Sequence, residues 1–183
     1  NLLQPQDRRS TAAGDSKTTV ETRAQLLDAG VGRTILEQFA RRAAALCSDD
    51  DPVVVDLGSG EGSLLAALAR LRPIAGVGID LSTAAAAHAA RHVPAMTWIV
   101  ANADRRLPFL DGSVQLVLSF HGRRNAAECA RVLAPVGHLL VAVPAADDLV
   151  ELREAVGGRS MARSGGDAPL IEHASMFTLI ERD

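Results

Sequence analysis

The stretch VVVDLGSGEGSLLAAL, residues 53–68, constrains the fold more than any other part of the chain. A run of β-branched residues is typical of a buried strand, and the Leu- and Ala-rich segment at its end is typical of a helix. Between them, three glycines at Gly58, Gly60 and Gly62 predict a tight turn. A strand that passes into a helix through such a turn is the first unit of an alternating α/β fold.

The same alternation continues along the chain. Further strands are predicted over 74–80, 96–101, 114–120, 138–143 and 176–181, and helices over about 61–71, 83–92 and 126–133, the last ended by Pro135 and Gly137. Right-handed crossovers then give a Rossmann-like, doubly wound and mostly parallel sheet. A helix capped by Asp15 or Ser16 and broken near DAGVG forms a lead-in. We expect a lead-in over 1–48 and one α/β domain over 49–183, with further sequence beyond its C-terminal end.

Composition narrows the function classes. The formal net charge is −3, so no overall basic field indicates nucleic-acid binding, and the near absence of aromatic residues argues against a surface that stacks many bases. Cys47 and Cys129 offer neither a disulfide framework nor paired metal ligands and suit a reducing cytoplasm. No apolar run reaches the roughly 20 residues of a membrane span. We therefore predict a cytoplasmic protein with no membrane partner.

The turn itself indicates which ligand it holds. In an open α/β sheet, ligands bind beyond the carboxyl ends of the strands, and glycines let the backbone approach them closely. Dinucleotide-binding turns read G-x-G-x-x-G, whereas this one reads G-x-G-x-G with Asp56 before it and Glu61 within it. Carboxylates would repel a pyrophosphate but attract the ammonium and sulfonium groups of S-adenosylmethionine. Each residue has a plainer alternative: Gly58 or Gly62 in tight packing, Asp56 bonded to turn amides, or Glu61 as a solvated residue of the first helical turn.

The next two strand ends support this prediction. Asp80 follows the second strand by the spacing at which an acid accepts hydrogen bonds from ribose hydroxyls, although it could instead cap the next helix. The segment ANADRRLPFLDGSVQLVLS resembles the part of class I methyltransferases that places adenine at the end of the third strand. The predicted donor-binding residues are Asp56, Gly58, Ser59, Gly60, Glu61, Gly62, Asp80, Leu81, Asn102, Ala103 and Asp104.

Longer segments resemble one branch of that class. GDSKTTVETRAQLLDAG, DLGSGEG, RLPF, AAECARVLAP and VPAADDLVELREAV occur in this order. Together they resemble the RlmA-type family of 23S rRNA guanine-N1 methyltransferases, whose members include macrolide-resistance enzymes. The resemblance implies methylation of guanine N1 in a 23S rRNA hairpin, with S-adenosylhomocysteine as the second product. It also implies a zinc-binding module before residue 1. The sequence leaves open whether the protein forms a homodimer.

The chain departs from the family pattern at several positions. The usual Pro-Gly-Gly before the fifth strand reads Pro135-Val136-Gly137, and Gln115 replaces the expected acid. Thr18, Thr19 and Val20 stand where family members often carry Met and Glu. We expect these changes to affect the substrate chemistry more than donor binding.

The residues of the chemical step are less defined. At the end of the fourth strand, Phe120 could stack on the target base and His121 could handle its proton, but Phe120 could also close the core and His121 could be an ordinary loop residue. Arg23 could reach the donor carboxylate or RNA. The candidates for RNA phosphate contacts are Arg8, Arg9, Arg23, Arg105, Arg106, Arg123 and Arg124. His88, His92 and His138 lack ligand spacing, so no metal site is predicted.

Three functions are consistent with these patterns. The first is an rRNA guanine-N1 methyltransferase. The second is a small-molecule methyltransferase of natural-product tailoring, which would work without RNA. The third is a donor-binding module without catalytic activity. Gln115 and Val136 keep the third alternative open.

Overall fold

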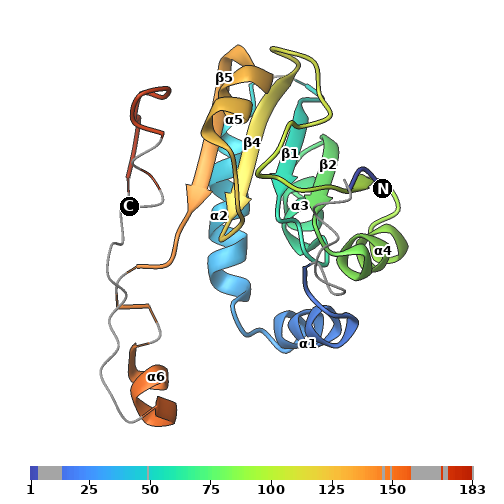
Figure 1. Cartoon of the computed structure of the whole chain (residues 1–183), viewed down its shortest axis with the longest axis vertical. Coiled ribbons are helices and arrows are strands. Elements are labelled where there is room, and N and C mark those ends of the chain that lie inside the picture. Colours follow the sequence, from blue (N-terminus) through green and yellow to red (C-terminus); the bar gives the residue numbers. More distant parts are fainter. Residues whose placement is uncertain are drawn as a thin grey trace. The chain divides into compact units, whose positions relative to one another are not determined.

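The computed structural model describes residues 1–3, 14–48, 50–145, 147–148, 150–157, 170 and 173–182. The chain divides into two compact units, Asn1–Val141 and Ala142–Asp183. The first contains α1 (Lys17–Asp28), α2 (Arg33–Leu46), β1 (Val53–Leu57), α3 (Ser63–Ala69), β2 (Ala75–Asp80), α4 (Thr83–His92), β3 (Thr97–Val100), β4 (Val114–Phe120), α5 (Ala126–Val132) and nearly all of β5 (Leu133–Ala142). The alternation predicted from the sequence is confirmed (Figure 1).

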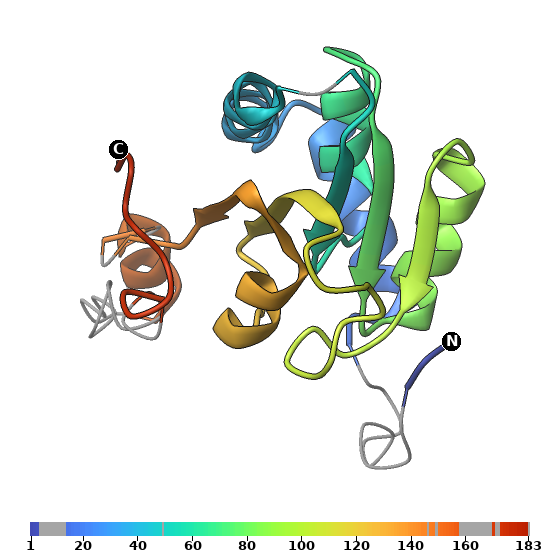
Figure 2. The same ribbon diagram turned by 90° about the horizontal axis from the view of Figure 1, so that it is seen from above.

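The strands form one five-stranded sheet in the order β3-β2-β1-β4-β5. The ladders of β1 with β2, β1 with β4 and β2 with β3 are all parallel, which confirms the doubly wound arrangement. From β1 the chain winds outward to β3 and then returns to β4 on the other side of β1. The switch point therefore lies between β1 and β4, and α2 and α5 lie on opposite sides of the sheet (Figure 2).

The core explains why these residues form strands. β1 and β4 are covered on both faces, so their runs of Val and Leu are nearly continuous instead of alternating with polar residues; Val54, Val55 and Leu57 are fully buried. On one face, α2 packs against α3 and β4 through an apolar stripe that includes Leu36 and Phe39. The rigid centre of the sheet holds the glycine turn at the end of β1 in a fixed place.

The lead-in helix α1 lies at the carboxyl ends of the strands (Figure 1). Ser16 caps it by accepting a hydrogen bond from the Thr19 N–H at 3.1 Å, as one of the two predicted caps. Just before the cap, Gly14 has φ +79° and lies so close to Ser82 that a β-carbon would come within 2.6 Å of the Ser82 amide nitrogen. The Ser82 hydroxyl donates to the Asp15 carbonyl at 2.6 Å. The lead-in is thus attached to the loop that follows β2.

Two predicted elements differ from the structure. Helix α5 ends at Val132 and passes directly into β5, so Pro135 and Gly137 lie inside a strand and do not separate two elements. A proline is tolerated there because β5 is the end strand of the sheet. The strand predicted over 176–181 is wrong, because a strand needs a hydrogen-bonded neighbour and none pairs with this segment in the described part of the chain. Leu179 and Ile180 are exposed.

The second unit contains α6 (Val150–Gly157) and the irregular segment 173–182. Across both units, none of the helices that the structure describes is long and apolar enough to cross a membrane.

Candidate functional site

The glycine turn is held in place by its own backbone amides. The N–H groups of Gly58 and Ser59 both donate to the Ile79 carbonyl, at 2.8 and 3.0 Å, and the Gly62 N–H donates to the Ser59 carbonyl at 3.0 Å. The Gly60 N–H donates to Oδ2 of Asp80 at 2.8 Å. The sequence predicted amides close to a ligand, but these four bind protein acceptors instead. The turn is therefore a rigid platform, and ligand recognition falls to the side chains around it.

The three glycines are required for close contacts at positive φ. A β-carbon on Gly58 would lie 3.0 Å from the Cα of Gly122, and one on Gly62, at φ +90°, would lie 2.7 Å from the Trp98 ring. The packing alternative therefore holds for Gly62, which forms the N-cap of α3. A β-carbon on Gly60 would lie 3.1 Å from the guanidinium of Arg23. Gly60 thus makes room for the Arg23 guanidinium over the turn.

Three carboxylates lie together beneath the turn, and we call Asp56, Glu61 and Asp80 the acidic turn cluster. Asp56 is 2% exposed and its Oδ1 has no hydrogen-bond partner; Glu61 is 8% exposed and its Oε2 has none. Burial, followed by the charges of Asp80 and Glu61, raises the pKa of Asp56 to about 8. Glu61 is not the solvated residue that the plainer alternative described. Buried acids without partners are costly, so this cluster is arranged to receive a cation.

Asp80 connects the turn to the loop after β2. Its Oδ2 accepts from the Gly60 N–H, and its Oδ1 accepts from the Ser82 N–H at 2.7 Å. The cap of α4 is Ser82, whose hydroxyl accepts from the Ala85 N–H, so Asp80 does not act as that cap. Each carboxylate oxygen has a second lone pair and can still accept a hydrogen bond from a ribose hydroxyl.

A hollow of about 390 Å³ opens beside the cluster, at the ends of β1, β2 and β3. This volume is in the range of small-molecule pockets. It is lined by Gly58, Ile79, Asp80, Leu81, Ala101, Asn102, Ala103, Asp104 and Arg123. Six of these are predicted donor-binding residues. Sequence reasoning missed Ile79 and Ala101, which adjoin predicted positions at strand ends, and assigned Arg123 to RNA. The lining and the unpartnered acids next to it fit a nucleoside that carries a positive charge.

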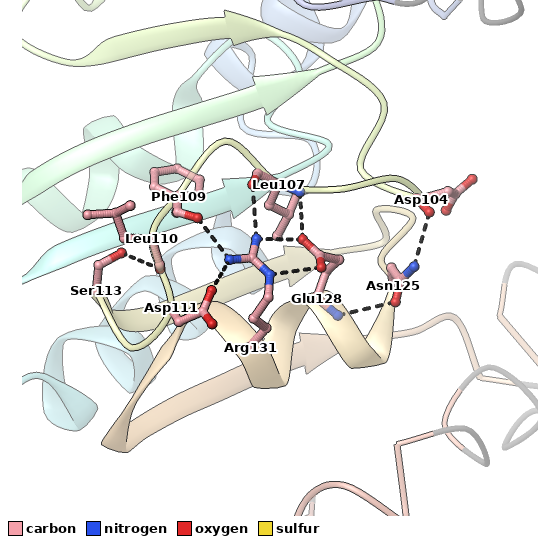
Figure 3. Close-up of polar contacts among 9 residues, drawn as sticks. All are labelled: Asp104, Leu107, Phe109, Leu110, Asp111, Ser113, Asn125, Glu128 and Arg131. Carbon is pink, nitrogen blue, oxygen red and sulfur yellow. Dashed lines mark hydrogen bonds and ion pairs between the residues drawn. The ribbon is translucent and has the colours of Figure 1, made fainter.

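The loop between β3 and β4 is fixed by α5 through a cluster that we call the loop clamp, formed by Asp111, Glu128 and Arg131 (Figure 3). Arg131 donates to both carboxylate oxygens of Glu128 at 2.9 and 2.6 Å and to Asp111 at 2.6 Å. It also donates to the carbonyls of Leu107 and Phe109, at 3.0 and 2.9 Å. The hydrogen bond from Arg131 lowers the pKa of Glu128.

Helix α5 and its N-cap Asn125 also hold the start of this loop, including Asp104, which lines the hollow. Glu128 accepts from the Leu107 N–H at 2.8 Å, and the Asn125 amide donates to the Asp104 carbonyl at 3.1 Å (Figure 3). Asp104 in turn accepts from the Arg123 guanidinium at 2.6 Å. Asp104, which is predicted to contact adenine, is thus held by hydrogen bonds from Asn125 and Arg123.

An aromatic pair lies at the carboxyl end of β4. The rings of Phe120 and His121 are stacked, with centroids 4.6 Å apart, and Phe39 meets Phe120 edge-on at 5.1 Å. Phe120 is half-buried, so it belongs both to the core and to the switch point. His121 is exposed and has φ +59°, a conformation that non-glycine residues adopt at a cost. Such strain is concentrated at functional sites.

The predicted RNA-contact residues fall into separate groups. Arg105, Arg106 and Arg123 are exposed, and Arg123 lines the hollow. Arg124 is half-buried, donates to the Gly122 carbonyl at 3.3 Å and has its pKa lowered by burial. Arg23 lies over the glycine turn. Arg8 and Arg9 lie outside the described residues.

Two departures from the family pattern lie far from this site. The Gln115 side chain accepts a hydrogen bond from the Val53 N–H at 2.8 Å, at the amino ends of β4 and β1. Val136 is exposed early in β5, one residue before Gly137, whose added β-carbon would meet the Gln115 carbonyl. Both lie towards the amino ends of their strands, whereas the site lies at the carboxyl ends, so they are not grounds for regarding the site as inactive.

Other features of the described residues offer less chemistry. A second hollow, of about 300 Å³, is lined by residues of α1, α2 and α3 and by Arg70, and contains none of the predicted donor-binding residues. Within the residues that the structure describes, no group of three His, Cys, Asp or Glu side chains could hold a metal ion.

The sequence and fold resemble those of known methyltransferases. Residues 54–137 match the family described as a methyltransferase domain. The chain is 38% identical over 161 residues to a 23S rRNA (guanine(748)-N(1))-methyltransferase of Streptomyces fradiae, a match that covers 86% of this chain and 56% of that protein. The chain spans about half the length of the curated relatives it matches, or less.

Two solved structures share the fold. One is the complex of the Haloferax volcanii Trm112 methyltransferase activator with a methyltransferase, at 27% identity and a TM-score of 0.60, covering 81% of this chain and 69% of that one. The other is a SAM-dependent methyltransferase of Thiobacillus denitrificans in complex with S-adenosyl-L-homocysteine, at 28% identity and a TM-score of 0.50, covering 60% of this chain and 48% of that one.

Proposed function

We propose that the protein is an S-adenosylmethionine-dependent methyltransferase that modifies N1 of a guanine in a 23S rRNA hairpin, because residues 54–137 match the family described as a methyltransferase domain. One observation carries the donor assignment: the acidic turn cluster contains two buried carboxylates with unpartnered oxygens beside a hollow of nucleoside size. The target assignment is supported by the similarity of the chain to relatives named as 23S rRNA guanine-N1 methyltransferases.

The charges of the cluster favour a cationic donor over a nucleotide. Asp56, Glu61 and Asp80 bring up to three negative charges to the turn, and Arg23 lies 3.9 Å from Glu61. A pyrophosphate would meet like charges in a site of low dielectric, where repulsion is strong. The ammonium and sulfonium groups of S-adenosylmethionine would instead compensate the buried acids, and Asp56 would give up its proton as they bind.

The hollow orients the nucleoside part of the donor. Asp80 can accept hydrogen bonds from the two ribose hydroxyls while it keeps the Gly60 and Ser82 N–H groups. Leu81, Ala103 and the Asn102 and Asp104 side chains lie where the adenine ring would fit. When bound, the donor supplies an electrophilic methyl group on a sulfonium. The task of the protein is to hold the target nitrogen in line with the methyl carbon and the sulfur.

Phe120 and His121 are the proposed residues for the target base. Guanine N1 is buried in a base pair and carries a proton at neutral pH, so the base must be presented unpaired and its proton must leave as the new C–N bond forms. The exposed face of the His121 ring offers a stacking surface backed by Phe120. An imidazole is also a suitable proton acceptor near neutral pH.

We propose that Arg105, Arg106 and Arg123 contact RNA phosphates, because their side chains are exposed and Arg123 lines the hollow. Phosphate contacts fix the register of a bound nucleic acid and make binding dependent on salt. Arg124 is a weaker candidate because its side chain is half-buried. An rRNA substrate would also place the protein in the cytoplasm.

The proposal is tested by incubating the full-length protein with radiolabelled donor and unmodified large-subunit RNA, followed by mass spectrometry of nuclease fragments. Label in a single guanine, with the methyl group on N1, is the expected result. Label only in small metabolites would instead identify a small-molecule methyltransferase. Donor binding without transfer to RNA or to small molecules would identify a module that binds the donor without catalysis.

A further inference from the structure

Helix α1 carries a cation to the glycine turn. The guanidinium of Arg23 lies 2.9 Å from Oδ2 of Asp15 and 3.9 Å from Oε2 of Glu61. One of its nitrogens is also 3.1 Å from the position that a β-carbon on Gly60 would occupy. The side chain is 47% exposed, so it reaches the turn from the solvent side while Glu61 lies buried beneath it. The Arg23 guanidinium and the Glu61 carboxylate, whose Oε2 has no hydrogen-bond partner, thus meet at one turn.

The lead-in holds this cation in place from the N-terminal end of α1. Gly14 packs against Ser82, whose hydroxyl donates to the Asp15 carbonyl, and the Asp15 carboxylate then pairs with Arg23. A displacement of α1 would therefore break contacts with the loop after β2. The position of Arg23 relative to the acidic turn cluster is set by these links.

This pairing of charges matches an α-amino acid. The methionine end of the proposed donor carries an ammonium and a carboxylate on the same carbon atom, so its site needs negative and positive groups side by side. Glu61 and Asp56 have buried oxygens without hydrogen-bond partners for the ammonium. The guanidinium has five N–H donors in a planar fork and can hold a second carboxylate while it keeps Asp15.

We propose that Arg23 binds the α-carboxylate of the methionine moiety of the donor, and so selects a donor that is a complete amino acid. This inference rests on the proposed function, because it assigns a residue to the same donor site. It also moves Arg23 out of the set of RNA contacts.

The test compares two donors that differ in one group. Decarboxylated S-adenosylmethionine keeps the adenosine, the sulfonium and the ammonium but lacks the carboxylate. We expect Arg23→Gln to weaken the binding of S-adenosylmethionine by about 10- to 100-fold in calorimetry, the range for a lost hydrogen bond to a charged group. Its affinity for the decarboxylated donor should remain within about twofold of the wild-type affinity. Arg23→Lys should recover part of the loss.

Arg41→Gln is the matched control, because Arg41 is an exposed arginine of α2 that pairs with Glu37 at 3.7 Å. It should leave the affinity for both donors unchanged. Equal losses for both donors in Arg23→Gln would overturn the inference and give Arg23 a role in holding α1, as would no loss for either. If the wild-type protein bound neither donor, the proposed function itself would fail, which is a different result.

Discussion

The acidic turn cluster and the loop clamp are two groups of charged residues in one sheet unit, and they differ in how their charges are satisfied. In the clamp, Glu128 and Arg131 are mostly buried, and each bonds both its partner and the backbone of the loop. In the turn cluster, Asp56 and Glu61 are more deeply buried, yet each has an oxygen without a hydrogen-bond partner.

The difference separates charged residues that stabilise the fold from charged residues that are available to a ligand. A carboxylate that serves the fold is paired, because an unpaired buried charge costs more than the fold can gain from it. A buried acid oxygen that lacks a hydrogen-bond partner is instead a candidate for binding a ligand. The two clusters should therefore respond in opposite ways to pH and to substitution.

The largest effect is expected for Asp56→Asn. Because the pKa of Asp56 is raised from 3.8 to about 8 in the folded protein, its contribution to stability is fully present below about pH 4 and is lost as the pH rises towards 8. The neutral amide should remove this loss and stabilise the ligand-free protein at pH 8 by several kcal/mol. Urea unfolding at a series of pH values measures it. If the unfolding free energy of the variant changed with pH as much as that of the wild type, the pKa of Asp56 would not be raised in the folded protein.

The second effect is expected for Asp80→Ala. It removes the acceptor for the Gly60 and Ser82 N–H groups and for the proposed ribose hydroxyls. We expect the affinity for S-adenosylhomocysteine to fall about 100-fold, measured by calorimetry, since two hydrogen bonds to a charged group are lost. Asp111→Asn is the matched control in the clamp, and its affinity should not change. Similar losses in both variants would contradict the distinction between the clusters.

A third comparison uses one glycine from each region. Gly62→Ala and Gly112→Ala both place a side chain at positive φ, but a new β-carbon meets Trp98 at 2.7 Å in the first and nothing within 4 Å in the second. We expect a loss of unfolding free energy of about 1 kcal/mol for Gly112→Ala and about 3 kcal/mol for Gly62→Ala. Chemical denaturation measures both, and equal losses would mean that Trp98 moves aside without cost.

The smallest effect on the donor is expected for Arg131→Gln. The clamp contacts the loop behind the hollow, so donor affinity should fall only a few-fold, while the melting temperature falls by several degrees. The pKa of Glu128 is lowered by Arg131, so its stabilisation is present above about pH 4.5 and is lost as the pH falls below that value. This acid-side loss should disappear in the variant. A loss of affinity as large as that of Asp80→Ala would show that the clamp belongs to the donor site.

Most of the fold could be predicted from local patterns. The runs of β-branched residues, the glycine turn and the Ser16 and Ser82 caps each leave a clear sequence signal. The strand expected over 176–181 failed because apolar residues do not show whether a partner strand lies beside them. The early start of β5 was missed because Pro135 normally interrupts a strand and is tolerated only at the end of a sheet.

The positions of the site residues could be predicted from the sequence, but their hydrogen-bond partners could not. The spacing of Asp80 from the turn placed it at the hollow, but its bond to the Gly60 N–H needs the fold. The amides of the turn were expected to face a ligand, and only the structure shows them bound to Ile79, Ser59 and Asp80. The position of Arg23 over Gly60 depends on the docking of α1, which local patterns do not reveal.

The central claim is that buried acid oxygens without hydrogen-bond partners at the switch point receive a positively charged sulfur donor. Its most direct test is calorimetry at pH 7 with S-adenosylmethionine, NAD and a nucleoside triphosphate, in buffers with different ionisation enthalpies. We predict heat with S-adenosylmethionine alone, accompanied by proton release that is absent in Asp56→Asn. Clear heat with NAD or the triphosphate and none with S-adenosylmethionine would contradict the account.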